Sequence, residues 1–225
     1  MNYTYYGHST FLLEADGVKI VFDPFISPND LAKSIDVNGI KCDFILLSHG
    51  HGDHVADVET IARNNDATIV AVYELATYYG GKNLKFHPMN TGGSWDFGKF
   101  KVKTVNAVHS SVLPDGTNAG NPVGFIVTFD NKSIYYSGDT ALTLDMQLIG
   151  SYQKLDHAFL CMGDNFTMGV DEAIIASDFI KCNHITGMHF DTFPYIRINH
   201  ETAVSRFEKA GKKLILPEIG KTYDL

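Results

Sequence analysis

The sequence has few cysteines, and the three that it has form no recognisable pair. Cys42, Cys161 and Cys182 are odd in number, and no CxxC motif is present. A disulfide framework needs paired cysteines, so the composition argues against a small disulfide-rich secreted domain. Cys161 and Cys182 are interpreted as small core residues rather than metal ligands or nucleophiles. We therefore expect a reducing compartment, the cytoplasm.

Long apolar runs are also absent. No stretch approaches the ~20 apolar residues that a membrane-spanning helix needs. The N-terminal segment MNYTYYGHSTFLLE has neither the basic start nor the long apolar run of a signal peptide. The chain has no linker rich in serine and proline, no charge block and no low-complexity tract. We therefore expect no membrane partner and a single domain over residues 1–225.

Basic residues are fewer than acidic ones. The chain carries 18 Lys and Arg residues against 26 Asp and Glu residues, so its formal net charge is −8. Proteins that bind nucleic acid mainly through phosphate contacts usually have a basic surface, so no nucleic-acid partner is expected. Small anionic substrates remain compatible, because a metal site supplies local positive charge. The expected partner is a small-molecule substrate, and the sequence leaves a homo-oligomer open.

Short apolar, β-branched or aromatic runs recur along the chain, and each is typical of a strand. The runs are TFLLEA, VKIVFD, DFILLSH, TIVAVYE, FKVKTVNAV, GFIVTF, KSIYYSG, HAFLCMG, HITGMHF and KLILPE. ADGV and FDNKS have the composition of hairpin turns. Helices are predicted at residues 54–64, 171–181 and 200–210. Either Asn199 or Thr202 is the candidate cap of the last helix.

The two halves of the chain resemble each other in pattern. In the first half, a strand ending in FDPF is followed by KCDFILLSHGHGDH, a helix and TIVAVY. In the second half, KSIYYSGDT is followed by a helix, KLDHAFLCMGDNF, a second helix and HITGMHF. This weak repeat predicts two similar β-rich halves, each a sheet with helices outside. Such halves pack as a four-layer sandwich, in which loops from both meet at one edge.

The stretch LLSHGHGDHV at residues 46–55 contains three histidines and one aspartate within six positions. Two histidines two apart in an extended chain point the same way, so His49 and His51 can bind one cation. We expect the two glycines of this stretch to let the loop curl and bring Asp53 and His54 toward a second position. Mixed imidazole and carboxylate ligands suit zinc, with Fe or Mn as alternatives.

The HxHxDH hexad is the signature of the metallo-β-lactamase superfamily, which the chain resembles from Tyr6 to Pro217. Further segments are similar to a metal-dependent hydrolase subfamily that itself resembles the ascorbate-phosphate lactonases. These segments are YGHSTFLLE, DGTNAGNPVGFIV, SGDTALTLDM, GDNFTMGVDEA and MHFDTFP. The resemblance implies an α/β fold, the four-layer αβ/βα sandwich built from two similar halves, in agreement with the repeat.

The resemblance also implies the remaining metal ligands, each of which follows a predicted strand. They are the histidine of NAVHSS, the aspartate of YYSGDT and the histidine of GMHFDTFP. The implied set is His49, His51 and His109 for site one, Asp53, His54 and His189 for site two, and Asp139 as the bridge. Four of the five other histidines, His87, His157, His184 and His200, lack such a context.

Two divalent metal ions about 3.5–4 Å apart can share a hydroxide and lower its proton affinity toward neutral pH. The expected function is therefore a dinuclear metal-dependent hydrolase that uses a metal-bridging hydroxide to attack a small ester, lactone or phosphodiester. Two divalent ions are expected, with zinc favoured and Mn, Fe or Ni as alternatives. No GxSxG motif is present to suggest a serine nucleophile.

Two residues are assigned to catalysis. Asp53 is expected to orient the nucleophile and accept its proton, in addition to binding metal. The resemblance places His8 of YGHST near the metal centre as a substrate contact or proton donor, with a hairpin-fixing role as the alternative. Asp23 of VFDPF is expected to support a ligand or to cap a turn. Pocket candidates are Thr167, Met168, Phe190, Phe193 and Tyr195, with capping or core packing as the alternatives.

Two other functions fit part of the pattern. A single iron at this site would suit redox chemistry on oxygen, as in the sulfur dioxygenases of the superfamily. One iron per chain and thiol-dependent oxygen uptake would favour that reading. A non-catalytic metal-binding module is the third hypothesis, and the complete ligand set argues against it.

Overall fold

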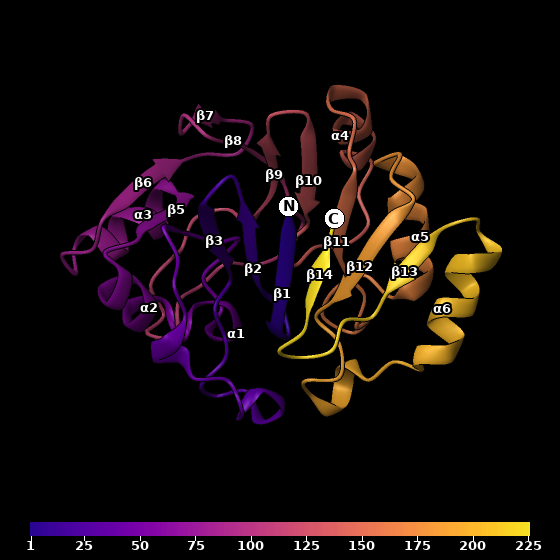
Figure 1. Ribbon diagram of the computed structural model, residues 1–225, viewed down its shortest axis with the longest axis horizontal. Coiled ribbons are helices and arrows are strands. Elements are labelled where there is room, and N and C mark those ends of the chain that lie inside the picture. Colours follow the sequence, from indigo (N-terminus) through magenta and orange to yellow (C-terminus); the bar gives the residue numbers. More distant parts are fainter.

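Two seven-stranded sheets face each other at the centre of the molecule (Figure 1). The computed structural model describes residues 1–225. The first sheet consists of β14 (Thr222–Asp224), β1 (Asn2–Gly7), β2 (Thr10–Ala15), β3 (Val18–Phe22), β4 (Phe44–Leu46), β5 (Thr68–Val72) and β6 (Phe86–Met89), in that order. The second consists of β13 (Lys213–Ile215), β12 (His184–Met188), β11 (His157–Cys161), β10 (Lys132–Tyr136), β9 (Val123–Phe129), β8 (Lys101–Asn106) and β7 (Ser94–Asp96).

Helices cover the outer faces of both sheets. Those of the first half are α2 (Val58–Asn65) and α3 (Tyr73–Gly80), and those of the second are α4 (Met146–Tyr152), α5 (Val170–Phe179) and α6 (His200–Lys209). The short helix α1 (Gly52–Val55) follows the loop after β4 at the edge of the sheet. Three 3₁₀ turns complete the set: η1 (Asp30–Ala32), η2 (Val37–Gly39) and η3 (Pro194–Ile196). Figure 1 shows α2 and α3 on the left and α5 and α6 on the right, so the predicted four-layer αβ/βα sandwich is confirmed. No helix combines the length and apolar character that a membrane crossing requires.

The two sheets repeat one pattern of strand directions. Neighbouring strands are antiparallel from β14 to β3 and parallel from β3 to β6. The second sheet is antiparallel from β7 to β10 and parallel from β10 to β13. The internal repeat is therefore confirmed, and β3 corresponds to β10. Because parallel strands end at the same edge of a sheet, the loops that follow them gather there.

The space between the sheets is filled by aromatic side chains. The rings of Phe22 on β3 and Tyr136 on β10 stack with their centroids 4.7 Å apart. The ring of Phe11 on β2 lies 4.6 Å from that of Phe159 on β11. All four side chains are buried, and burial of each contributes roughly 1.5–3 kcal/mol to the free energy of folding. This packing makes the two sheets a rigid support for the loops at their edge.

The single helix predicted over 54–64 is wrong, because the segment forms two helices that separate at Asp57. The Asp57 backbone has left the helical region at φ −106° and ψ 6°. Its buried carboxylate accepts hydrogen bonds from the backbone N–H groups of Ile26 at 2.6 Å and Ser27 at 2.9 Å. The sequence periodicity continues across this break, but Asp57 is needed to hold the loop after β3.

The other two predicted helices are confirmed as α5 and α6. The cap of α6, which the sequence left undecided, is Asn199, whose side-chain oxygen accepts from the Thr202 backbone N–H at 2.8 Å. The predicted hairpin turns also form, with Asp16 and Asp130 in the left-handed region at φ 51° and 46°. Aspartate tolerates this conformation better than most residues.

Candidate metal centre

The seven predicted ligands meet at one edge of the sandwich. Four come from the segment between β4 and the end of α1, and the others follow β8, β10 and β12, as predicted. The seven residues are His49, His51, Asp53, His54, His109, Asp139 and His189. Because the strands that precede them belong to both sheets, the site depends on how the two halves pack together.

A group of three histidines forms one side of the site. Ring nitrogens of His49, His51 and His109 all lie within 4.8 Å of one another. The Nε2 atom of His49 is 3.1 Å from Nδ1 of His51, while the outer nitrogens of these rings contact Ser48 Oγ at 2.9 Å and Ser110 Oγ at 3.1 Å. The serines thus fix the ring orientations that leave inward-facing nitrogens for a cation.

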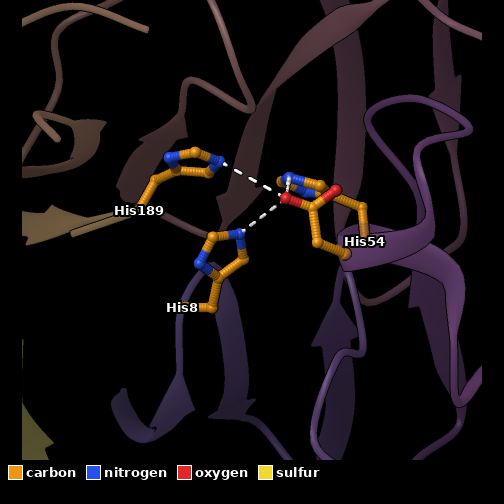
Figure 2. A group of neighbouring side chains, drawn as sticks. His8, His54 and His189 are labelled. Carbon is orange, nitrogen blue, oxygen red and sulfur yellow. Dashed lines mark hydrogen bonds and ion pairs between the residues drawn. The ribbon is translucent and has the colours of Figure 1, made fainter. Parts of the chain in front are cut away.

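A second group surrounds the carboxylate of Asp53 (Figure 2). The Oδ2 atom of Asp53 lies 3.1 Å from His8 Nε2, 3.7 Å from His189 Nε2 and 4.0 Å from His54 Nε2. His54 and Asp53 come from α1, and His189 reaches the carboxylate from the opposite sheet. One carboxylate surrounded by imidazoles is a donor set that suits zinc, iron or manganese.

Asp139 lies between the two groups. Its Oδ2 atom is 2.9 Å from His189 Nε2 and 3.2 Å from His54 Nε2 in the second group. The same oxygen is 3.7 Å from His109 Nε2 and 4.0 Å from His49 Nε2 in the first group. One buried carboxylate oxygen is therefore within reach of ligand nitrogens on both sides.

The local charges favour a cation. Burial raises the pKa of Asp139, but His189 and His54 outweigh it and hold this pKa well below its usual range. Burial lowers the pKa of His189, yet Asp139 and Asp53 raise it to about 9. The pKa of His54 is likewise held well above its usual value by Asp139 and Asp23 despite burial. Protons on these histidines therefore occupy positions that a metal ion would take.

The first group behaves differently. Burial lowers the pKa values of His49, His51 and His109 below that of free histidine. These rings are therefore neutral at physiological pH, which is the form that binds metal.

Unpaired polar atoms show that the cluster fits a metal. His54 Nε2 and Asp139 Oδ1 are buried and have no hydrogen-bond partner. His54 Nε2 is close to Asp139 Oδ2, but the two are not aligned for a hydrogen bond. Leaving a buried polar atom without a partner costs roughly 1–3 kcal/mol, and a bound cation would remove that cost at both atoms.

Asp23 contacts the ligand His54 and the residues around it through hydrogen bonds. It lies directly after β3, and it is fully buried. Its carboxylate accepts from the Ser48 N–H at 2.8 Å and from Tyr136 Oη at 2.8 Å, and it contacts His54 Nδ1 at 2.9 Å. The last contact turns His54 Nε2 toward the site, so these hydrogen bonds agree with the expected supporting role.

His8 contacts the second group through its ring. Its Nε2 atom is 3.1 Å from Asp53 Oδ2, and its Nδ1 atom is 2.9 Å from Thr192 Oγ1. Burial, reinforced by nearby His189, lowers the pKa of His8 to about 3, so the ring is neutral. A neutral ring can donate to Asp53 with Nε2 while Nδ1 accepts from the threonine hydroxyl.

The two glycines of the motif do not act as the sequence suggested. Neither Gly50 nor Gly52 has a positive φ, so no left-handed bend is needed at either. A Cβ atom at Gly50 would lie 2.4 Å from the Cβ of Ala119, whereas one at Gly52 would lie 3.5 Å from the nearest atom, Pro114 Cγ. Gly50 is therefore required for space, because the loop after β8 packs directly against it.

We expect Gly50→Ala to destabilise the fold by about 1–3 kcal/mol, because the added methyl group has no room. Urea unfolding of the metal-loaded protein measures this loss. Gly52→Ala is the matched control and should leave the unfolding midpoint unchanged. Equal effects of the two substitutions would show that the close approach of Ala119 is not the reason for Gly50.

A cavity of 540 Å³ opens onto the cluster. It is lined by His51, Asp53, His109, Ser110, Asp139, Phe166, His189, Phe193, Pro194 and Tyr195. Phe193 and Tyr195 were predicted as pocket candidates, whereas Met168 and Phe190 are buried away from it, and Thr167 does not line it. Sequence reasoning missed Phe166, although it stands in GDNFTMG directly after β11.

Comparisons with known proteins identify the family of the chain. The family model described as a beta-lactamase superfamily domain matches residues 2–189. The chain is 55% identical over 225 residues to a UPF0173 metal-dependent hydrolase of Flavobacterium johnsoniae, and 41% identical over 230 residues to one of Bacillus subtilis; both matches cover each chain completely.

A solved structure of a metallo hydrolase has the same fold. Igni18, a metallo hydrolase from Ignicoccus hospitalis, superposes with a TM-score of 0.90 at 31% identity, covering 100% of this chain and 98% of that one. The predicted family is thereby confirmed. The chain belongs to the beta-lactamase superfamily and, within it, to the UPF0173 metal-dependent hydrolases.

Proposed function

We propose that the chain is a dinuclear hydrolase of a small ester, lactone or phosphodiester, with zinc as the favoured metal. The observation that carries the proposal is the position of Asp139 Oδ2, within 4.0 Å of nitrogens from both ligand groups. The proposed ligands are His49, His51 and His109 for one ion, Asp53, His54 and His189 for the other, and Asp139 for both. Since both sheets supply ligands, residues 1–225 are proposed to act as one domain.

Bound metal ions would supply Lewis acidity and a nucleophile derived from water at neutral pH. The chain itself supplies the proton acceptor. Asp53 is part-exposed, and its side chain lines the cavity. Burial raises the pKa of Asp53, but His189 and His8 outweigh it and keep the carboxylate ionised. An ionised carboxylate at the cavity wall can orient a water molecule, and Asp53 is the proposed acceptor of the proton of that water.

His8 is proposed to act through Asp53. It is buried and does not line the cavity, so direct contact with substrate is not the role that its position favours. Its ring instead connects Thr192 to Asp53 Oδ2, which fixes the direction of the carboxylate. We regard His8 as a positioning residue.

The function is tested by screening metal-loaded protein against esters, lactones, thioesters, phosphodiesters and cyclic nucleotides. The Asp139→Ala variant, prepared in the same way, is the blank. Hydrolysis that disappears with Asp139 supports the proposal. Thiol-dependent oxygen uptake without hydrolysis would contradict it and would favour the single-iron redox alternative.

Replacing His8 with alanine is expected to lower kcat by about 10- to 100-fold while KM and bound metal change little, because only the direction of Asp53 is lost. Thr192→Val removes the second partner of the same ring and should lower kcat in the same direction by less. Steady-state kinetics with metal analysis separates these outcomes. A rise in KM at constant kcat would indicate a substrate contact instead.

A further inference from the structure

The cavity over the metal centre has two chemically different ends. The inner end consists of the ligand side chains, and the outer end consists of Phe166, Phe193, Pro194 and Tyr195. Neither lysine nor arginine contributes to its lining. Sites that recognise phosphate groups normally supply guanidinium or ammonium groups for the oxygens that a metal leaves free. The outer end of this cavity offers an aromatic surface instead.

Phe166 and Tyr195 form the rim of this aromatic surface. Their ring centroids are 6.4 Å apart and the rings are inclined by 78°, which is an edge-to-face arrangement. Phe166 is 50% exposed and Tyr195 is 75% exposed. They reach the rim from different elements, the β11–α5 loop and η3, so the surface is built by tertiary structure. Large aromatic side chains that stay exposed beside a site commonly mark a binding surface.

The loop that carries Phe166 makes a tight turn. Asp164 and Asn165 are both in the left-handed region, at φ 62° and 50°. Aspartate and asparagine are the non-glycine residues that adopt this conformation most readily. Hydrogen bonds from the Asp164 N–H to Met168 O at 3.0 Å and from the Asn165 N–H to the Asp164 carboxylate at 2.8 Å maintain the turn. Phe166 is therefore presented by a preformed loop.

We infer that the substrate is an uncharged carboxylic ester or lactone whose aromatic or branched apolar group binds between Phe166 and Tyr195. This inference rests on the proposed function and narrows its substrate class by excluding phosphodiesters. A phosphodiester carries a permanent negative charge, and its flanking groups would meet a rim without cations. An uncharged ester places its carbonyl at the ligand cluster. Its apolar group is then buried against the aromatic rim, and no charged group loses its contact with water.

The reaction consumes one water molecule. The water oxygen bonds to the carbonyl carbon, and the ester C–O bond breaks. The leaving oxygen takes the proton that Asp53 accepted from the water, and the products are a carboxylic acid and an alcohol.

Three matched probes test the inference on metal-loaded protein: benzyl acetate, methyl acetate and dibenzyl phosphate. The first two differ only in the phenyl ring, and the third joins the same ring to a charged diester. We expect kcat/KM for benzyl acetate to exceed that for methyl acetate by about 10- to 100-fold. The Phe166→Ala/Tyr195→Ala double variant should lose this preference, so that the ratio of the two kcat/KM values falls to about one.

Tyr152→Ala is the matched control, because Tyr152 is similarly exposed on α4 and does not line the cavity. A preference that survives in the double variant, or faster hydrolysis of dibenzyl phosphate, would overturn the inference while leaving the hydrolase in place. Binding of the unreactive ketone 4-phenylbutan-2-one, followed by saturation-transfer NMR, provides a readout that needs no turnover. Loss of ketone binding in the double variant but not in Tyr152→Ala would support the proposed aromatic binding surface even if no ester is hydrolysed. Ketone binding that persists in the double variant would contradict the inference.

Discussion

Replacing Asp139 with alanine is expected to lower metal-dependent hydrolysis by about a thousandfold and to remove at least one of the two proposed metal ions. The Oδ2 atom of Asp139 is the one carboxylate oxygen within 4.0 Å of ligand nitrogens in both groups. Its removal eliminates the proposed shared ligand. It also removes the negative charge that does most to raise the pKa of His189. The loss therefore exceeds that expected for a ligand of a single ion.

The experiment is a steady-state assay on the best substrate, with metal content measured on the same preparation. Asp139→Asn separates charge from shape, because asparagine keeps one oxygen but cannot neutralise two cations. Asp171→Ala is the control, since Asp171 is exposed and pairs only with Arg206 on the surface. An Asp139→Ala protein that keeps two ions and more than about a tenth of the activity would contradict the bridging role.

Replacing Asp23 with asparagine is expected to cost about 2–4 kcal/mol of unfolding free energy and to weaken metal binding by about 10- to 100-fold. The amide NH2 of asparagine would replace one carboxylate oxygen. At one position it would meet the Ser48 N–H and at the other the Tyr136 hydroxyl, so two hydrogen-bond donors would face each other. Burial and the neighbouring Asp23 raise the pKa of Tyr136 well above 10, so this phenol remains a donor. The contact that fixes His54 Nδ1 would be disturbed as well.

Asp57→Asn provides the matched control for this prediction. Asp57 is also buried and accepts from backbone N–H groups, but none of its hydrogen bonds involves a histidine. We expect Asp57→Asn to destabilise the fold without changing metal affinity once the protein is folded. Urea unfolding and competitive zinc titration measure the two quantities separately. Equal losses of metal affinity in both variants would show that Asp23 acts only through stability.

The central strands and the ligand positions were predictable because local pattern and topology agree there. All ten predicted strand segments form. They are β2 to β5 and β8 to β13. Buried parallel strands appear in sequence as short apolar runs, and a polar residue directly after such a run lies at the edge of the sheet. His189 directly follows the parallel strand β12, and Asp139 lies three residues beyond β10, which is parallel to β11. His109 follows the antiparallel strand β8, so its place in the site was implied by the family resemblance rather than by this rule.

Three of the elements that were not predicted, β6, β7 and α3, have weak local signals. β6 and β7 lie at sheet edges and are short and partly exposed, so no run of buried residues marks them. α3 follows β5 without a break, and its sequence YELATYYG looks like a continuation of an apolar strand. In each of these cases the tertiary neighbours, rather than local propensity, decide the structure.

The spatial details of the site were beyond the sequence for a related reason. The need for Gly50 depends on Ala119, which is 69 positions away along the chain and approaches only after the two halves pack. The aromatic rim likewise combines Phe166 and Tyr195 from separate loops. The chemistry of the ligands could be predicted from residue types, whereas the shape of the cavity required the fold.

The most direct test of the account is the number of metal ions per chain. Protein expressed with added zinc and freed of loosely bound metal by gel filtration should contain two equivalents by inductively coupled plasma mass spectrometry. The His49→Ala/His109→Ala double variant should contain at most one, while His184→Ala, which alters an exposed histidine outside the cluster, should retain two. One equivalent in the unaltered protein, or an unchanged content in the double variant, would contradict the proposed dinuclear centre.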